Sequence, residues 1–188
     1  MKNRNLIKSQ IVQAWHECID EDYCNQRINS EHSLQASFWS HLNKQLPKNR
    51  RLFIEPGISI NTTDGIKKLV PDIVVCNTKE VISIIELKYL PRAQPKFLKD
   101  IKNLSLIAQN RELITIANNR FRGAEKDSNN YTLSKNILFV WAGVHAKIKI
   151  ENRVLFSDNY VSLDNCYLQL HAETESNNKP TVYQITHE

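Results

Sequence analysis

The chain has 188 residues, 41% of them hydrophobic, which suits one globular domain or one domain with an appendage. Its net charge of +5 is unevenly placed: residues 1–150 carry 23 basic and 14 acidic side chains, whereas residues 151–188 carry 2 and 6. A basic body of this kind is typical of nucleic-acid binders. The sequence has no GxxxxGK[ST] loop and no GxGxxG turn, which argues against a nucleotide cofactor. It also has no membrane-length apolar run and no signal-peptide pattern, which predicts a cytoplasmic protein without membrane contact.

The first 28 residues predict a helical extension that precedes the main domain. Apolar side chains recur every four positions between residues 5 and 22, which is typical of an amphipathic helix. The acidic stretch Asp20-Glu21-Asp22 falls at the carboxyl end, where it opposes the helix dipole and predicts fraying. The apolar positions of this helix are Ile7, Ile11, Trp15 and Ile19.

Residues 30–46 predict a second helix, with Asn29 or Ser30 as its cap. At 100° per residue, Glu31 projects into the apolar stripe of this helix, where a glutamate is unusual. The alternative is that Glu31 simply stabilises the helix dipole from the first turn. The stripe consists of Leu34, Phe38, Leu42 and Leu46.

Three strand-like segments follow. Residues 52–60 contain Glu55 and are broken by Pro56-Gly57, and Asp64-Gly65 is a hairpin signal. Residues 69–76 and 81–90 are apolar on both faces and are separated by a polar stretch of hairpin-loop length. Lys67 and Lys68 lead into the second of the three segments, where they are candidates for contact with a nucleic-acid backbone.

Charged side chains interrupt these last two segments at Asp72, Glu86 and Lys88. Burying charges in such strands is costly unless they are paired or bound to metal. Because side chains alternate along a strand, Glu86 and Lys88 share a face, and in an antiparallel hairpin Asp72 lies beside Glu86. Two carboxylates and a neighbouring backbone carbonyl form a hard oxygen site suited to Mg²⁺ or Mn²⁺. The alternative is a cross-strand ion pair on an exposed edge, against which the apolar runs argue.

A basic helix is predicted after this pair of strands, from Pro95 to about Asn110. Its lysines lie opposite the apolar stripe formed by Phe97, Ile101, Leu104 and Ala108, and with Arg92 they are candidates for a phosphate path. The alternative is a solvated basic face. Gln94, which closely follows the strand-like segment of residues 81–90, is a candidate for polarising water. The lysines of this helix are Lys96, Lys99 and Lys102.

The remaining segments carry weaker signals. Residues 113–116 are an apolar run that length alone does not assign to a strand or a helix. We interpret residues 117–136 as a surface loop, residues 136–144 as a final core strand, and residues 172–180 as flexible. Weak strands are predicted near residues 154–156 and 181–185, within an acidic C-terminal appendage of residues 151–188. The four cysteines match no zinc spacing and are interpreted as reduced thiols.

Pro71-Asp72 followed by Glu86-Leu87-Lys88 resembles the PD-(D/E)XK motif of the restriction-endonuclease-like nuclease superfamily. The resemblance implies an α/β fold with an αβββαβ core, a central mixed sheet flanked by helices, over residues 29–150. It implies Mg²⁺ or Mn²⁺ held by Asp72, Glu86 and the Leu87 carbonyl, with Lys88 orienting the nucleophile. A first-helix glutamate often joins this site, which makes Glu31 the expected third carboxylate and Glu55 its alternative.

We therefore predict a metal-dependent deoxyribonuclease whose catalytic residues are Asp72, Glu86 and Lys88. The alternative is a catalytically silent module that uses the same fold to bind nucleic acid or a partner protein. DNA is the expected partner, and a homodimer is expected because many members of the superfamily that the motif resembles act as dimers. The sequence leaves open DNA or RNA, endonuclease or exonuclease action, substrate specificity and the biological pathway.

Overall fold

The computed structural model describes residues 2–62, 65–95, 97–147, 160–175 and 178–187. The helical elements are α1 (Lys2–Glu17), the π-helix η1 (Cys18–Tyr23), α2 (Glu31–Gln45), α3 (Leu98–Gln109) and the short 3-10 helix η4 (Val161–Leu163). The first five strands are β1 (Arg51–Ile54), β2 (Ile58–Thr62), β3 (Gly65–Leu69), β4 (Ile73–Cys76) and β5 (Glu80–Leu90). The last four are β6 (Thr115–Arg122), β7 (Glu125–Ala146), β8 (Tyr167–Glu175) and β9 (Asn178–His187).

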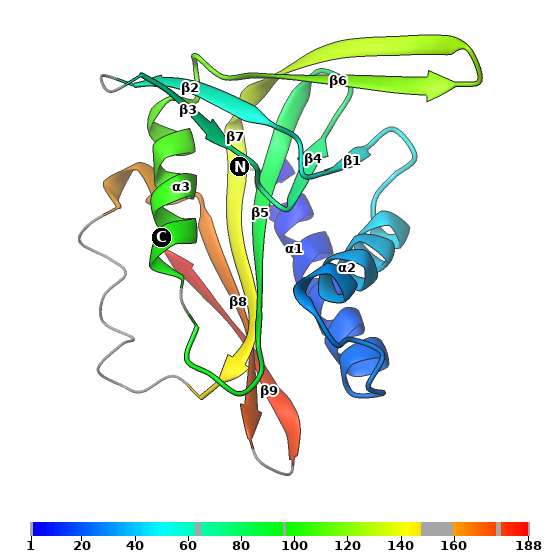
Figure 1. Cartoon of the computed structure of the whole chain (residues 1–188), viewed down its shortest axis with the longest axis vertical. Coiled ribbons are helices and arrows are strands. Elements are labelled where there is room, and N and C mark those ends of the chain that lie inside the picture. Colours follow the sequence, from blue (N-terminus) through cyan, green and yellow to red (C-terminus); the bar gives the residue numbers. More distant parts are fainter. Residues whose placement is uncertain (1, 63–64, 96, 148–159, 176–177, 188) are drawn as a thin grey trace.

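A seven-stranded mixed sheet forms the centre of the protein, in the order β1-β4-β5-β7-β8-β9 with β6 paired to β7. The pairs β5–β7 and β7–β8 are parallel and the others are antiparallel. Helix α3 covers one face, and α1 and α2 lie on the other (Figure 1). The succession α2, β1, β4, β5, α3, β7 is the expected αβββαβ order. The predicted α/β class, a central mixed sheet flanked by helices, is confirmed.

The sheet has a hydrophobic core on each face, because strand side chains alternate. Ile84 of β5 packs in the core beneath α3, together with Ile101 and Leu104. Ile85 and Leu87, the alternate residues of the same strand, belong to the core beneath α1 and α2. This alternation explains why β5 is apolar on both faces until Glu86.

The two N-terminal helices follow the sequence expectation, with one correction. The apolar positions of α1 and η1 are buried, and Ser30 caps α2 through a reciprocal capping box with Ser33. The predicted fraying near Asp22 is wrong. That stretch is a π-helix, in which Asp22 accepts a hydrogen bond from Ser37 Oγ at 2.6 Å and lies 3.1 Å from His41 Nε2. These side-chain bonds to α2 outweigh the unfavourable dipole.

The predicted break at Pro56-Gly57 is confirmed, and it separates two sheets. β1 pairs with β4 in the central sheet, whereas β2 pairs with β3 in a separate two-stranded sheet. β4 begins at Ile73 rather than at residue 69, so Asp72 stands just before the strand. The helix predicted from Pro95 begins later, at Leu98.

The interpretation of residues 117–136 as a loop is wrong. β6 and β7 form a hairpin that extends away from the sheet (Figure 1). Its cross-strand partners are polar side chains that contact one another, such as Arg120 with Asp127 and Ser128 with Asn119. Because both faces of this arm are exposed, no apolar alternation marks it in the sequence.

The C-terminal strands extend the central sheet. The prediction that residues 172–180 are flexible is wrong for the described part of this segment, which belongs to β8 and β9. The strand predicted near residues 181–185 lies within β9, and the one near 154–156 falls outside the described residues. All four cysteines are free thiols. Among the described helices, none is both long and apolar enough to cross a membrane.

Candidate active site

Two carboxylates meet where β4 begins. β4 and β5 pair antiparallel with Ile73 opposite Ile85, so the next position along places Asp72 beside Glu86, as strand alternation predicts. The Glu86 side chain is buried and Asp72 is half-buried. Both lie on the face of the sheet that α3 covers.

Two carboxylates at this edge, Asp72 and Glu31, are held by the backbone of β5. β4 begins at Ile73, opposite Ile85, so beyond Ile85 the N–H groups on the β4 side of β5 have no partner among the described strands, whereas the other side of β5 stays paired with β7. The Leu87 N–H donates to Asp72 Oδ2, and the Tyr89 N–H donates to Glu31 Oε2 at 3.2 Å. Because the N–H and C=O of a strand residue point to the same side, the Leu87 carbonyl also faces this edge.

Burial and mutual repulsion dominate the electrostatics of the pair. Burial raises the pKa of Asp72 to about 6, the Leu87 N–H acts against this, and the charge of Glu31 adds to it. Burial raises the pKa of Glu86 to about 9, reinforced by the charges of Asp72 and Asp100. A buried and a half-buried carboxylate that resist ionisation together form a site that a cation would stabilise.

Lys88 lies between two further acids. Its Nζ is 3.4 Å from Glu31 Oε2 and 3.6 Å from Asp100 Oδ2. Burial acts to lower the pKa of Lys88, but the charges of Asp100 and Glu31 outweigh it, so the pKa is raised overall. The ammonium is therefore charged and oriented within reach of the site.

Sequence reasoning missed Asp100. This residue lies in the first turn of α3, is buried, and accepts a hydrogen bond from Trp141 Nε1 at 3.3 Å. Burial raises its pKa, while Lys88 and Trp141 act in the opposite direction. The indole lies over Gly143, where a Cβ would come within 2.3 Å of the ring. Spacing could have found Asp100, because Phe97 and Leu104 at i−3 and i+4 place it on the apolar stripe, the argument that singled out Glu31.

The oxygen donors of this site suit a Mg²⁺ or Mn²⁺ ion that is only partly enclosed by protein. Over the described part of the chain, no three His, Cys, Asp or Glu side chains are gathered closely enough to enclose a metal. Mg²⁺ is usually held by one or two carboxylates, completed by water and substrate phosphates, rather than by an all-protein cage. Asp72, Glu86 and the Leu87 carbonyl match that pattern.

The candidates for a third carboxylate lie at different depths. Glu31 reaches the edge of the site but bonds to the Tyr89 N–H and Lys88. The Glu55 side chain is exposed, although its backbone N–H donates to the Asp72 carbonyl at 3.0 Å. Gln94 donates to the Lys147 carbonyl. Metal coordination by Glu31 or Glu55, and a water-polarising role for Gln94, stay predictions.

Four of the six predicted nucleic-acid-binding residues surround one groove. The groove has a volume of about 600 Å³ and is lined by β3, by Val70 directly after it, and by α3. Arg92 is exposed in the turn after β5, and Lys96 falls outside the described residues. The groove adjoins the acidic site, since Val70, which lines it, lies two residues before Asp72. The basic residues that line it are Lys67, Lys68, Lys99 and Lys102.

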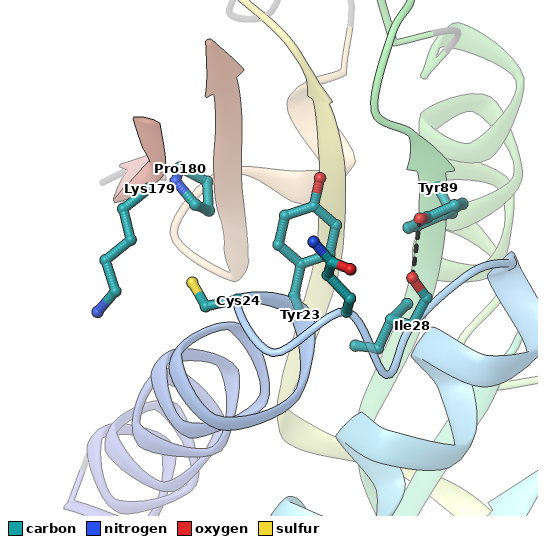
Figure 2. A pocket seen from close by; sticks show the side chains of 7 residues that line it. Tyr23, Cys24, Ile28, Tyr89, Lys179 and Pro180 are labelled. Carbon is teal, nitrogen blue, oxygen red and sulfur yellow. Dashed lines mark hydrogen bonds between the residues drawn. The ribbon is translucent and has the colours of Figure 1, made fainter. Parts of the chain in front are cut away.

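A second pocket, of about 430 Å³, lies on the other face of β5 from Lys88 (Figure 2). The Tyr89 hydroxyl on its wall donates to the Ile28 carbonyl at 3.0 Å, and Tyr23 contacts Tyr89 edge-on. Lys179 at its rim pairs with Asp20 at 3.0 Å. Because the Tyr89 side chain faces the side of β5 opposite to Glu86 and Lys88, this pocket is separate from the carboxylate pair.

Comparison with known proteins yields little. No protein-family model matches the chain, and no curated protein matches it. Among solved structures it is similar to P. aeruginosa ATCC27853 NucC in a cAAA-bound form, with a TM-score of 0.41 and 10% sequence identity. That similarity covers 97% of this chain and 82% of the other. A TM-score this low establishes neither a shared fold nor a shared function, so the proposal below depends on the site itself.

Proposed function

We propose that the protein is a metal-dependent nuclease that hydrolyses phosphodiester bonds of DNA. One observation carries the proposal: Asp72, half-buried, and Glu86, buried, form a pair of carboxylates with raised pKa values at an open edge of β5. Folding such a pair costs free energy unless the site has a use for it. The pattern Pro71-Asp72 and Glu86-Leu87-Lys88, which resembles the PD-(D/E)XK motif, supports the same conclusion.

Each residue has a distinct task in this proposal. Asp72, Glu86 and the Leu87 carbonyl hold the ion, which when bound supplies a lowered water pKa and neutralises phosphate charge. Lys88 holds the attacking water or a phosphate oxygen in line with the scissile bond. Water attacks phosphorus, the P–O bond to the leaving oxygen breaks, and the products are a phosphate monoester and a hydroxyl end.

Asp100 is a positioning residue in this scheme. Its carboxylate contacts Lys88 but is itself oriented by Trp141, so it fixes where the ammonium lies without touching the substrate. Glu31 contacts Lys88 from the opposite side, at the start of α2. The lysine is therefore fixed by two helices and does not depend on substrate for its orientation.

The test is a cleavage assay with linear, circular, single-stranded and branched DNA and with RNA, in Mg²⁺, Mn²⁺ or EDTA. The expected result is metal-dependent cleavage of DNA by the wild type and none by Asp72→Ala. Asp20→Ala is the matched control, because Asp20 is an exposed acid in a surface ion pair. Tight, salt-sensitive DNA binding by folded wild type without cleavage on any substrate would instead favour a silent binding module. The expected homodimer is checked in the same preparation by light scattering.

A further inference from the structure

The groove beside the active site has two chemically different linings. Lys67, Lys68, Lys99 and Lys102 give it positive charge, while Val70 and Leu98 add aliphatic side chains that are 56% and 49% exposed. Single exposed apolar residues are ordinary on protein surfaces. Here two of them line the same cationic groove, where phosphate binding alone would not use them.

One of the aliphatic residues lies close to the catalytic carboxylates. Val70 precedes Asp72 by two residues, and two residues of chain span at most about 7 Å. Leu98, at the start of α3, lines the same groove as Val70. A strand whose scissile phosphate lies at Asp72 therefore places a neighbouring nucleotide at Val70, in the groove that Leu98 also lines.

The lining matches the parts of a nucleotide. Lysine ammonium groups bind phosphate oxygens, and aliphatic side chains pack against the apolar face of a base or a deoxyribose. Asn103, which also lines the groove, has an amide that can donate to or accept from a base edge. A volume of about 600 Å³ is within the range of small-ligand sites. A duplex hides its base faces by stacking and presents only their edges, so this lining favours an unpaired strand.

We infer that the groove between β3 and α3 is a subsite for an unpaired nucleotide next to the scissile phosphate. Its base packs on Val70 and Leu98, and its flanking phosphates contact the four lysines. This inference rests on the proposed nuclease function and narrows its substrate to single strands, overhangs or flaps. Fully paired DNA is disfavoured, because unstacking a base costs free energy before the groove can accept it.

The test measures binding in EDTA, so that it does not depend on cleavage. The probe is a fluorescein-labelled single strand of 20 nucleotides, with one abasic position moved along it. We expect one abasic position to lower wild-type affinity about fivefold. Leu98→Ser is expected to lower affinity for the intact strand by a similar factor, with no further loss at that abasic position. Val70→Ser serves as an independent second variant. Both side chains are half-exposed, so both variants are expected to fold.

Lys99→Ala is the matched control, because it changes the neighbouring residue of the same groove. It is expected to weaken binding equally at every abasic position and to reduce the salt slope by about 0.7. Equal affinity of Leu98→Ser and the wild type for the intact strand would overturn the inference. A uniform response to all abasic positions, or tighter binding of a blunt duplex than of the single strand, would also overturn it. Absence of cleavage in the metal assay would count against the nuclease proposal. The binding assay would still show whether the groove holds an unpaired nucleotide, because it is run without metal.

Discussion

Two polar clusters lie on the α3 face of the sheet, and they are built in opposite ways. One is the acidic site around Asp72 and Glu86. The other centres on His145 and His171, both buried, with His145 Nε2 lying 2.9 Å from His171 Nδ1. His171 stacks on Tyr183, with ring centroids 4.7 Å apart, and the Tyr183 hydroxyl donates to Glu173 at 2.7 Å.

The difference lies in whether donors and acceptors match. In the histidine cluster, burial lowers the pKa of His145, so a neutral imidazole meets its partners through complementary hydrogen bonds, and the Glu173 carboxyl accepts from the Tyr183 hydroxyl. In the acidic site, like charges face each other and burial raises the pKa of both Asp72 and Glu86. Burial of polar groups therefore does not by itself indicate chemistry. Unmatched charge at an open strand edge does.

The largest expected effect separates the clusters by activity. Alanine at Asp72, Glu86 or Lys88 is expected to lower metal-dependent cleavage by roughly 10³-fold or more, since each removes several kcal/mol of charge stabilisation. His171→Ala is expected to leave the activity of the folded protein near wild type. The measurement is the single-turnover cleavage rate, normalised to the folded fraction from circular dichroism. An equal loss of cleavage activity in His171→Ala and in the acidic-site variants would contradict the claim that only the acidic site is catalytic.

Stability is expected to separate them in the reverse direction. His171→Ala removes a buried hydrogen-bond partner and is expected to lower the free energy of unfolding by about 1–3 kcal/mol. Glu86→Gln removes a buried carboxyl that stays protonated in the folded protein but ionises in the unfolded chain, so it is expected to raise the melting temperature of the metal-free protein above that of the wild type at pH 8. Thermal melts in EDTA measure both. A lower melting temperature for Glu86→Gln would mean that its carboxylate stabilises the fold.

The pH dependence of stability should follow from the same pair. Acids whose pKa is raised on folding favour the native state below their unfolded pKa, near 4, and that contribution is lost as pH rises through the folded values of about 6 and about 9. The melting temperature in EDTA is therefore expected to fall between pH 5 and 9, and to fall less in Glu86→Gln. Identical pH profiles for the two proteins would show that Glu86 does not titrate in this range.

A smaller effect should report on the positioning of Lys88. Asp100→Asn keeps the shape of the side chain but removes its charge, and about a 10- to 100-fold loss of cleavage is expected. Trp141→Phe removes the hydrogen bond to Asp100 and part of the buried indole that packs against Phe97, but it keeps the charge of Asp100, so a loss of about 2- to 10-fold is expected. The pH profile of cleavage distinguishes positioning from simple damage. Its basic limb should move to lower pH in Asp100→Asn, because Lys88 loses a neighbour that raises its pKa.

Much of the site was predictable because it depends on local patterns. Strand alternation sufficed to place Asp72 beside Glu86, and the helical period placed Glu31 in the apolar stripe of its helix, whereas its contact with Lys88 is seen only in the structure. Asp100 was not predicted because only the lysines of α3 were considered as functional residues, although Asp100 lies on the apolar face of this helix. Its contact with Trp141 also depends on the parallel pairing of β5 and β7, which lies beyond local sequence.

The fold was less predictable where elements are polar on both faces. The β6–β7 hairpin was interpreted as a loop because exposed strands need no apolar alternation, and its order depends on cross-strand pairs such as Arg120 with Asp127. β8 was not predicted for a different reason. It is buried over most of its length, but it pairs with β7, which is separated from it in the chain, and residues 172–180 are polar enough to suggest flexibility.

The most direct test of the central claim is calorimetric titration of the metal-free protein with Mn²⁺ at pH 7.5, in two buffers of different ionisation enthalpy. Because Glu86 has a pKa of about 9, it is protonated before metal binds. Binding at the Asp72–Glu86 pair should therefore release about one proton. The account predicts one binding event with that release, absent in Asp72→Ala and Glu86→Gln and retained in Asp20→Ala. Mn²⁺ binding of equal affinity and proton release in the wild type and Glu86→Gln would contradict it.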